Sequence, residues 1–258
     1  MKTLIVPFLL FLTIFACKNE NVPNDENQLQ VENIDEAREY PNSINKVLEA
    51  HGGLETWNKM KTLKFTIAHE EGSEITTTDL RNRYSLIETE KFTIGFDGNE
   101  AWIDQDSTYF KNDPNFYHNL MFYFYAMPFV LADEGIEYSE ADSLKFEGKS
   151  YPGIKISYKD GVGSSSKDEY ILYYDQNSHK MAWLGYTVTY FSKEKSTEYS
   201  YIKYDEWHTI NSLLLPKNLK WFNVENDSIA NMRNEMKFEN VSLSEQESPN
   251  DMFGKPQD

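Results

Sequence analysis

Cysteine is almost absent from this sequence, because its 258 residues contain a single one, Cys17. No intramolecular disulfide can form, so packing alone must hold the fold. Basic residues are also few: 25 Lys and Arg stand against 42 Asp and Glu, which gives a formal net charge of −17. A chain this acidic is repelled by phosphate backbones, whose neutralisation nucleic-acid binding requires, so we set a nucleic-acid partner aside.

Long apolar runs are equally scarce. The first one follows Met1-Lys2-Thr3 and extends from Leu4 to Ala16, broken only by Pro7 and Thr13. It is shorter than the roughly 20 apolar residues of a membrane-spanning helix, and a positive start before such a run is typical of a signal peptide. We therefore expect a signal peptide over residues 1–16, and no later segment is long and apolar enough to be a second membrane span.

The residues around the cysteine, Ile14-Phe15-Ala16-Cys17, resemble the lipobox of bacterial lipoproteins. That resemblance implies cleavage before Cys17 and a diacylglycerol on its sulfur, with palmitate as the expected label. An ordinary secretory signal with an incidental cysteine is the alternative. Lys18, not Asp, follows the cysteine, so the inner-membrane retention signal is absent. The resemblance then favours the outer membrane and leaves open whether the protein faces the periplasm or the surface.

The next segment, residues 17–32, is rich in Asn, Asp, Glu and Gln. It is too polar to bury a core, so we expect a flexible tether between the lipid and the domain. The remainder, residues 33–258, is long enough for one all-β domain or two small ones, and we predict a single domain.

The domain opens with helical signals and continues with strands. Pro41 to His51 predicts a helix that ends at Gly52-Gly53, and Leu54 to Met60 predicts a second short one. Apolar alternation with period two then predicts strands; it recurs at Leu63/Phe65/Ile67, Tyr84/Leu86, Phe92/Ile94/Phe96, Ile154/Ile156/Tyr158, Tyr170/Leu172/Tyr174, Tyr186/Val188/Tyr190, Tyr199/Tyr201, 213–222 and 229–243. Turns such as Asp97-Gly98-Asn99 favour hairpins. The prediction is a mainly β fold, a curved antiparallel sheet of about ten to eleven strands that forms an incomplete barrel.

One segment breaks this pattern. Residues 116–127 read FYHNLMFYFYAM between Pro114 and Pro128 and predict one helix that is apolar on nearly every face. Such a helix must be buried in the barrel as a plug or must cover an apolar opening as a lid. For the second case we predict a ligand pocket, because methionine and aromatic side chains adapt to varied apolar guests; its predicted lining is Phe116, Leu120, Met121, Phe124, Met127 and Trp102.

A family resemblance adds to this picture. The stretch VLEAHGGLETWNKMKTLKF at residues 47–65, and LLLPK at residues 213–217, resemble a family of uncharacterised Bacteroidota lipoproteins and, more distantly, the LolA/LolB-like lipoprotein-localisation superfamily. The resemblance implies an incomplete antiparallel barrel wrapped over helices, with an apolar cavity that holds acyl chains in the carriers. No residue of this chain maps onto a known acyl-contact position, so only the architecture carries over.

Signals for catalysis or metal binding are weak. The five histidines show no metal-ligand spacing, and no second cysteine exists for a thiolate site, so we predict no metal and no cofactor. His69 beside Glu70 and Glu71 comes nearest to a cluster, and we interpret it as an exposed strand end. His51 is expected at a helix C-terminus, where a positive charge is favourable. Neighbouring carboxylates are expected by chance among 42 acidic residues.

The leading hypothesis is therefore a non-enzymatic, lipid-anchored protein of the cell envelope. It would hold a hydrophobic ligand, such as an acyl chain or lipoprotein lipid, between the curved sheet and the aromatic helix. The first alternative is an envelope scaffold or assembly factor whose barrel is filled and whose surface binds a protein partner that the sequence does not identify. An envelope hydrolase is the second.

Overall fold

A computed structural model describes residues 39–70, 72–106, 108–159, 165 and 167–256. The predicted signal peptide, Cys17 and the polar tether lie outside the described residues. The chain from Glu39 onward forms one compact unit. In the described part, no helix has the length and apolar character needed to cross a membrane.

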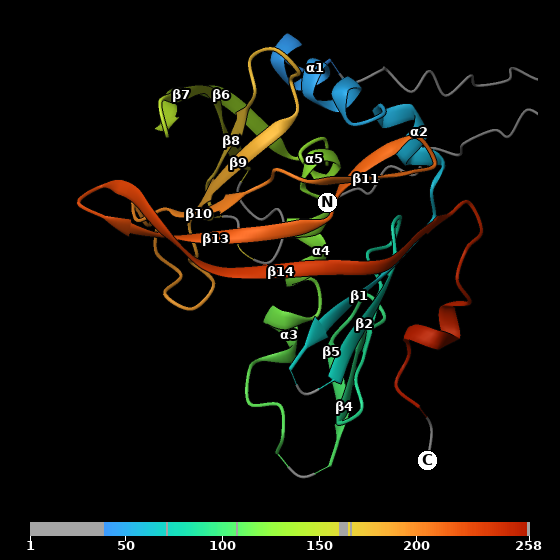
Figure 1. The fold of residues 1–258 in the computed structure, drawn as a ribbon. Coiled ribbons are helices and arrows are strands. Elements are labelled where there is room, and N and C mark those ends of the chain that lie inside the picture. Colours follow the sequence, from blue (N-terminus) through green and yellow to red (C-terminus); the bar gives the residue numbers. More distant parts are fainter. Residues whose placement is uncertain (1–38, 71, 107, 160–164, 166, 257–258) are drawn as a thin grey trace, which may run out of the picture. The chain divides into compact units, whose positions relative to one another are not determined.

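Helices and strands occupy most of this unit (Figure 1). The helices are α1 (Asn42–Ala50), α2 (Leu54–Lys59), α3 (Pro114–Tyr117), α4 (Leu120–Tyr125), α5 (Met127–Val130) and the 3₁₀ turn η1 (Asn250–Phe253). The strands are β1 (Thr62–His69), β2 (Gly72–Asp79), β3 (Ser85–Glu88), β4 (Phe92–Phe96), β5 (Ala101–Gln105), β6 (Ile136–Phe146), β7 (Lys149–Tyr158), β8 (Tyr170–Tyr174), β9 (Met181–Tyr186), β10 (Ser200–Lys203), β11 (Trp207–Ile210), β12 (Leu213–Pro216), β13 (Asn218–Glu225) and β14 (Ser228–Ser244).

Twelve of the strands form one antiparallel sheet in the order β5-β4-β3-β2-β1-β14-β13-β10-β9-β8-β7-β6, and β11 and β12 form a small hairpin. The first and last strands pair along their length, from Thr62 opposite Ser244 to Ile67 opposite Phe238. The sheet curves but does not close, because β5 and β6 remain its two edges. The predicted mainly β class with an incomplete antiparallel barrel is confirmed.

The strand count is higher than the predicted ten to eleven, and some strand ends differ. Strands β2, β6 and β11 were not predicted. Strand β2 reads GSEITTTD, with a single apolar residue, and β6 reads IEYSEADSLKF, whose alternation is interrupted by a polar centre. Strand β9 ends at Tyr186, its last pair with Tyr170 of β8, so the predicted extension through Val188 and Tyr190 is wrong. The predicted strand over residues 213–222 is two strands, β12 and β13.

The prediction of one continuous helix over residues 116–127 is wrong. The segment forms three short helices, α3, α4 and α5, because the backbone leaves helical geometry at Asn119 and Ala126. Helix α3 begins at Pro114, with the side chain of Asp113 accepting the N–H of Asn115. Pro128 does not end the segment: it lies in the first turn of α5, where proline's missing N–H costs nothing.

These three helices connect the two free edges of the sheet, since they follow β5 and precede β6 in the chain. The connection passes along the inside of the curved sheet (Figure 1). There, α4 and α5 supply much of the core: Phe122, Tyr125 and Phe129 are almost completely buried. This part of the segment behaves as the predicted plug.

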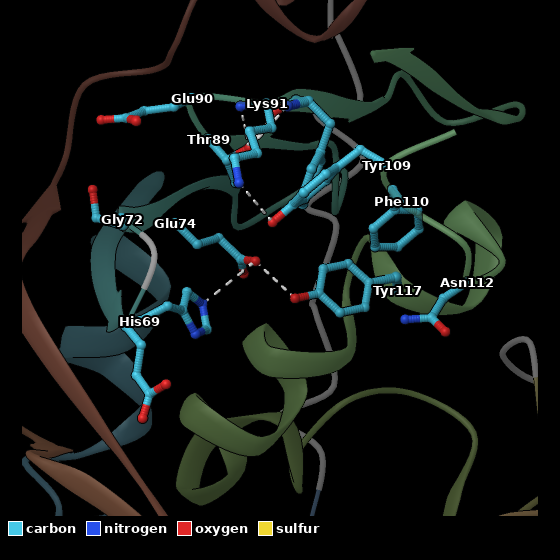
Figure 2. A pocket seen from close by; sticks show the side chains of 13 residues that line it. His69, Gly72, Glu74, Thr89, Glu90, Lys91, Tyr109, Phe110, Asn112 and Tyr117 are labelled. Carbon is cyan, nitrogen blue, oxygen red and sulfur yellow. Dashed lines mark hydrogen bonds and ion pairs between the residues drawn. The ribbon is translucent and has the colours of Figure 1, made fainter. Parts of the chain in front are cut away.

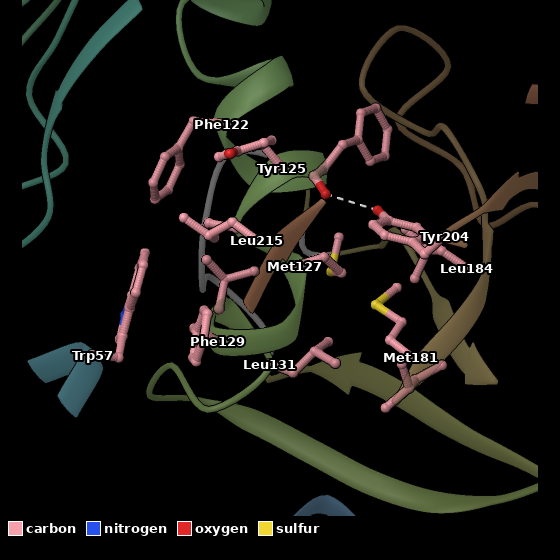
Figure 3. Packing of buried hydrophobic residues seen from close by; sticks show 14 of the residues in the cluster. Trp57, Phe122, Tyr125, Met127, Phe129, Leu131, Met181, Leu184, Tyr204 and Leu215 are labelled. Carbon is pink, nitrogen blue, oxygen red and sulfur yellow. Dashed lines mark hydrogen bonds between the residues drawn. The ribbon is translucent and has the colours of Figure 1, made fainter. Parts of the chain in front are cut away.

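Aromatic contacts hold the plug in place (Figure 3). The ring of Phe129 stacks on Trp57 of α2, with centroids 4.5 Å apart and planes inclined by 6°. The hydroxyl of Tyr204, just after β10, donates a 2.7 Å hydrogen bond to the carbonyl oxygen of Phe124. That bond satisfies a backbone acceptor near the end of α4 inside the core.

His51 ends α1 as predicted, but without a positive charge. Its side chain is buried, and its Nδ1 lies 2.7 Å from the carbonyl oxygen of Val47, an acceptor, so Nδ1 carries the proton. The ring packs edge-on against Trp207, at 4.6 Å between centroids. Burial lowers the pKa of His51 to about 4, so the imidazole is neutral at pH 7. The expected favourable charge at the helix end is therefore wrong.

Candidate ligand pocket

A pocket of about 220 Å³ opens beside α3 and α4. Its walls come from the helical segment, from the chain just after α5, from the end of β7 and the start of β8, and from the loop after β9. These segments meet because α3 and α4 leave one edge of the sheet and cross toward the other, where β7 pairs with the edge strand β6 and β8 pairs with β7.

The apolar floor of the pocket consists of Phe116, Leu120 and Phe124. Their spacing of four residues places them on one side of a helical path, even though the path is interrupted at Asn119. Phe124 is 7% exposed and belongs to the core as well, with its ring 4.9 Å from that of Tyr186. The floor is thus the outward-facing surface of the plug.

Tyrosines form one wall. Tyr123 of α4, Tyr158 at the end of β7 and Tyr170 at the start of β8 line the pocket. The rings of Tyr158 and Tyr170 meet edge to face, with centroids 6.0 Å apart. Burial raises the pKa of each of the three phenols, so their hydroxyls stay neutral. A neutral hydroxyl can donate and accept hydrogen bonds, which places polar contacts inside an otherwise apolar pocket.

The charged residues of the lining, as far as the structure describes it, are acidic: Asp133, Glu134 and Asp168. The side chain of Asp168 is fixed by Thr189, because its Oδ1 accepts the N–H and the hydroxyl of that residue at 2.6 and 2.7 Å. Asp133 accepts a 2.7 Å bond from Arg83, which neutralises part of this charge. The pocket therefore favours neutral ligands over anions.

Three aromatic rings cluster beside the pocket: Phe116 and Tyr190 line it, and Phe191 packs against both of them. We name these three residues the aromatic lip. The ring of Phe116 lies 4.9 Å from Tyr190 and 5.0 Å from Phe191, between centroids. Phe191 is 69% exposed, the largest exposure among the exposed large hydrophobic side chains of the described residues. An exposed aromatic ring next to an apolar pocket marks a surface suited to binding.

The structure brings together three of the six predicted ligand-binding residues. Phe116, Leu120 and Phe124 line the pocket, and Met121, Met127 and Trp102 do not. Met121 packs half-buried against the core, and Met127 is part of the core itself. Met121 lies in the same unbroken helix as Leu120 and Phe124 but one residue along and so on another face. Met127 lies beyond the break at Ala126.

Trp102 has a structural role on β5. It pairs with Gly95 of β4, and its indole occupies the space that a Cβ at Gly95 would need. Its Nε1–H donates a 2.8 Å bond to the carbonyl oxygen of Phe253. The tryptophan thus fixes η1 to the sheet at a distance from the pocket lining.

Tyr123, Tyr158, Tyr170 and Tyr190 also line the pocket, although the sequence pattern did not predict them there. Tyr158 and Tyr170 were predicted only as strand residues. A signal was present, since both stand at strand ends that flank one connection, where side chains of two neighbouring strands converge. Tyr190 was placed in a strand that does not exist.

A family model described as "Family of unknown function (DUF6503)" matches residues 91–237, more than half of the chain. No curated protein matches the sequence.

Several solved structures match at low identity. A DUF1329 family protein from Desulfovibrio piger is 9% identical with a TM-score of 0.44, over 78% of this chain and 91% of that one. A putative outer membrane lipoprotein-sorting protein domain from Vibrio parahaemolyticus is 7% identical with a TM-score of 0.43, over 81% and 96%. A LolA superfamily protein from Nitrosomonas europaea is 9% identical with a TM-score of 0.38, over 81% and 96%. At this level of similarity none of them informs on the ligand.

Proposed function

We propose that this chain, which belongs to the DUF6503 family, is a lipid-anchored protein of the cell envelope that holds the apolar part of a neutral amphiphile in the pocket beside α3 and α4. The anchor would be the lipid on Cys17, and the membrane would be the outer membrane. Both of these assignments are predictions from the sequence around Cys17. The family description names no function, so the proposal rests on the side chains of this chain.

The observation that carries the proposal is the aromatic lip beside the apolar floor. The ring of Phe191 is mostly exposed to water, and its centroid lies 5.0 Å from that of Phe116, which lines the pocket. Covering such a ring gains roughly 25 cal/mol for each Å² removed from water. A ligand chain that enters between the lip and the floor would cover this ring and be stabilised by that free energy.

Size and polarity narrow the ligand. The pocket volume of about 220 Å³ lies below the roughly 300–1,000 Å³ of typical small-molecule sites, so it suits one chain or part of one. The tyrosine hydroxyls can donate to an ester or amide carbonyl, and the three carboxylates repel an anionic head. An esterified acyl chain fits this chemistry better than a free fatty-acid anion.

A titration with a monoacylglycerol and with the fatty acid of the same chain length tests the proposal. We expect calorimetry on the chain beyond the predicted signal, with Cys17→Ser, to show saturable binding of the ester and weaker binding of the acid. Leu120→Trp, which fills the floor, should abolish ester binding. Its matched control is Met121→Trp, one residue along the same helix and outside the lining. Failure of both ligands to bind would overturn the proposal.

A filled scaffold is the second candidate, because α4 and α5 occupy the inside of the sheet with fully buried rings such as Phe129. In that case the aromatic lip would contact a protein and the small pocket would hold no ligand. The proposal assigns no catalytic step. In the described part, no group of three or more His, Cys, Asp or Glu side chains could hold a metal ion.

A further inference from the structure

A second pocket, of about 450 Å³, adjoins α3 at Tyr117 (Figure 2). It is bordered by the end of β1 and the start of β2, by the turn between β3 and β4, and by the chain that leads into α3. The two pockets share no lining residue, although Phe116 lines the first and its neighbour Tyr117 lines the second.

Glu74 of β2 is the central residue of this second pocket. Its side chain is 3% exposed, and its Oε2 accepts a 2.7 Å hydrogen bond from the hydroxyl of Tyr117. The Nε2 of His69 lies 3.9 Å from the same oxygen, too far for a hydrogen bond. The other oxygen, Oε1, has no hydrogen-bond partner in the described part of the chain. Figure 2 shows the carboxylate between His69 and Tyr117, facing the pocket.

A carboxylate in this position is costly to the fold. Burial raises the pKa of Glu74, because the charged form loses its hydration, and one hydrogen bond from Tyr117 does not replace it. An apolar side chain at this strand position would fold with less penalty. An unfilled acceptor on a buried acid that lines a pocket is the arrangement expected when a ligand supplies the missing donor.

The rings around Glu74 favour a cation. Phe92, Phe110 and Tyr117 form a continuous wall, with centroids 4.9 Å apart for the first two and 5.0 Å for Phe110 and Tyr117. At the edge of the pocket, the chain's own Lys91 already places its Nζ 4.5 Å from the ring centroid of Tyr109. This contact shows that the aromatic lining accepts an ammonium group.

The charges that face the pocket agree with this preference. Its lining contains the carboxylates of Glu70, Glu74 and Glu90 and one cationic side chain, Lys91, together with His69. Among the described lining residues, three carboxylates stand against the single ammonium of Lys91, an excess of negative charge that attracts positive ligands.

We propose that this pocket is a second binding site, which takes a primary ammonium group: Glu74 accepts its N–H through the unfilled Oε1, and the aromatic wall packs against the attached carbon chain. A primary ammonium fits better than a quaternary one, because only the primary group donates the missing hydrogen bond. The ligand is a free small amine, because a pocket of about 450 Å³ falls within the range of sites that enclose a whole small molecule.

The test uses three probes of one shape: benzylamine, benzyltrimethylammonium and benzyl alcohol, titrated by calorimetry into the Cys17→Ser chain beyond the predicted signal. We expect benzylamine to bind, and the other two to bind at least about tenfold more weakly, since a hydrogen bond to a charged group contributes roughly that much. Equal binding of benzyl alcohol would overturn the proposal.

Variants separate the site from general effects of charge. Glu74→Gln keeps the shape and removes the charge, and we expect it to weaken benzylamine about tenfold or more. Tyr117→Phe removes the donor that supports the ionised carboxylate and should weaken benzylamine as well, which keeps the test open if the first variant misfolds. The matched control is Glu88→Gln, an exposed glutamate outside the lining that changes the net charge equally. Unchanged benzylamine binding in Glu74→Gln would contradict the assignment.

Competition identifies the source of the amine. Displacement of benzylamine by Nα-acetyl-lysine amide would indicate a peptide, displacement by phosphatidylethanolamine vesicles would indicate a lipid head, and displacement by neither would support a free small amine. Glu74→Gln should leave monoacylglycerol binding in the first pocket unchanged, so failure at one site is distinguishable from failure at the other.

Discussion

The hydroxyl of Tyr190 donates a hydrogen bond to Oδ2 of Asp113 across 2.9 Å. The other oxygen of Asp113 accepts the N–H of Asn115 and so begins α3. The hydrogen bond from Tyr190 is the largest of several causes that hold the pKa of Asp113 below its ordinary value. One carboxylate thus joins the loop after β9 to the helix that carries Phe116, which fixes the aromatic lip at the edge of the pocket.

Replacing Tyr190 with Phe tests the positioning of the lip. We expect monoacylglycerol affinity to fall several-fold while the free energy of unfolding changes by less than about 0.5 kcal/mol, because the bond is at the surface. Calorimetry and urea unfolding measure the two effects. Tyr199→Phe is the matched control, since it also removes a phenol–carboxylate bond, to Glu169, but outside the pocket lining. An equal loss of affinity in both variants would contradict the assigned role.

Replacing Phe124 with Ala tests the plug. Its ring packs against Tyr186 and Trp221 and is 7% exposed, so we expect the free energy of unfolding to fall by roughly 3–5 kcal/mol. Urea unfolding gives the value. Phe191→Ala removes the same atoms from an exposed ring and should change stability by about 0.5 kcal/mol or less. Similar costs for the two variants would show that α4 is not core.

The buried His51 predicts acid sensitivity. Its folded pKa of about 4 is below the ordinary 6.5, so between these values the unfolded chain binds a proton that the folded chain excludes. The stabilisation is complete above pH 6.5 and is lost as the pH falls toward 4, by roughly 3 kcal/mol for this group. Urea unfolding at several pH values measures the slope. His51→Gln should reduce the slope by about one proton, and an unchanged slope would contradict the buried neutral state.

How much of this fold the sequence could predict depended on where apolar alternation was strong. The pattern at Leu63, Phe65 and Ile67 predicted β1 correctly, since these side chains are fully buried on one face. It failed for β2 and β6, where threonines and charged residues occupy the strands and backbone pairing with neighbours, not local preference, maintains them. It also failed at residues 116–127, because composition shows that a segment is buried but not where its backbone turns.

The candidate pocket was predictable only in part, for the same reason. The four-residue spacing of Phe116, Leu120 and Phe124 is visible in the sequence, and these three do line the pocket. The tyrosine wall comes from strands distant along the chain, and no local pattern reports which strand ends approach α4. The buried Glu74 was equally hidden, since an acid in a strand reads as a solvent-facing residue until its neighbours are known.

The lipid anchor remains a prediction from the sequence around Cys17. Cys17→Ser should abolish incorporation of radiolabelled palmitate and move the protein from the membrane fraction to the soluble fraction. Lys18→Asp is an informative companion, because it should keep the label while shifting the protein toward the inner membrane. Palmitate that still enters Cys17→Ser would contradict the anchor.

Native mass spectrometry on the chain beyond the predicted signal, with Cys17→Ser and purified without detergent, tests the central claim most directly. The proposed function predicts an added mass that dissociates on denaturation, extracts into organic solvent as a neutral acyl ester, and is lost in Leu120→Trp but retained in Met121→Trp. A mass that matches the bare chain, unchanged after monoacylglycerols and phospholipids are offered, would contradict the proposed function and favour the filled scaffold.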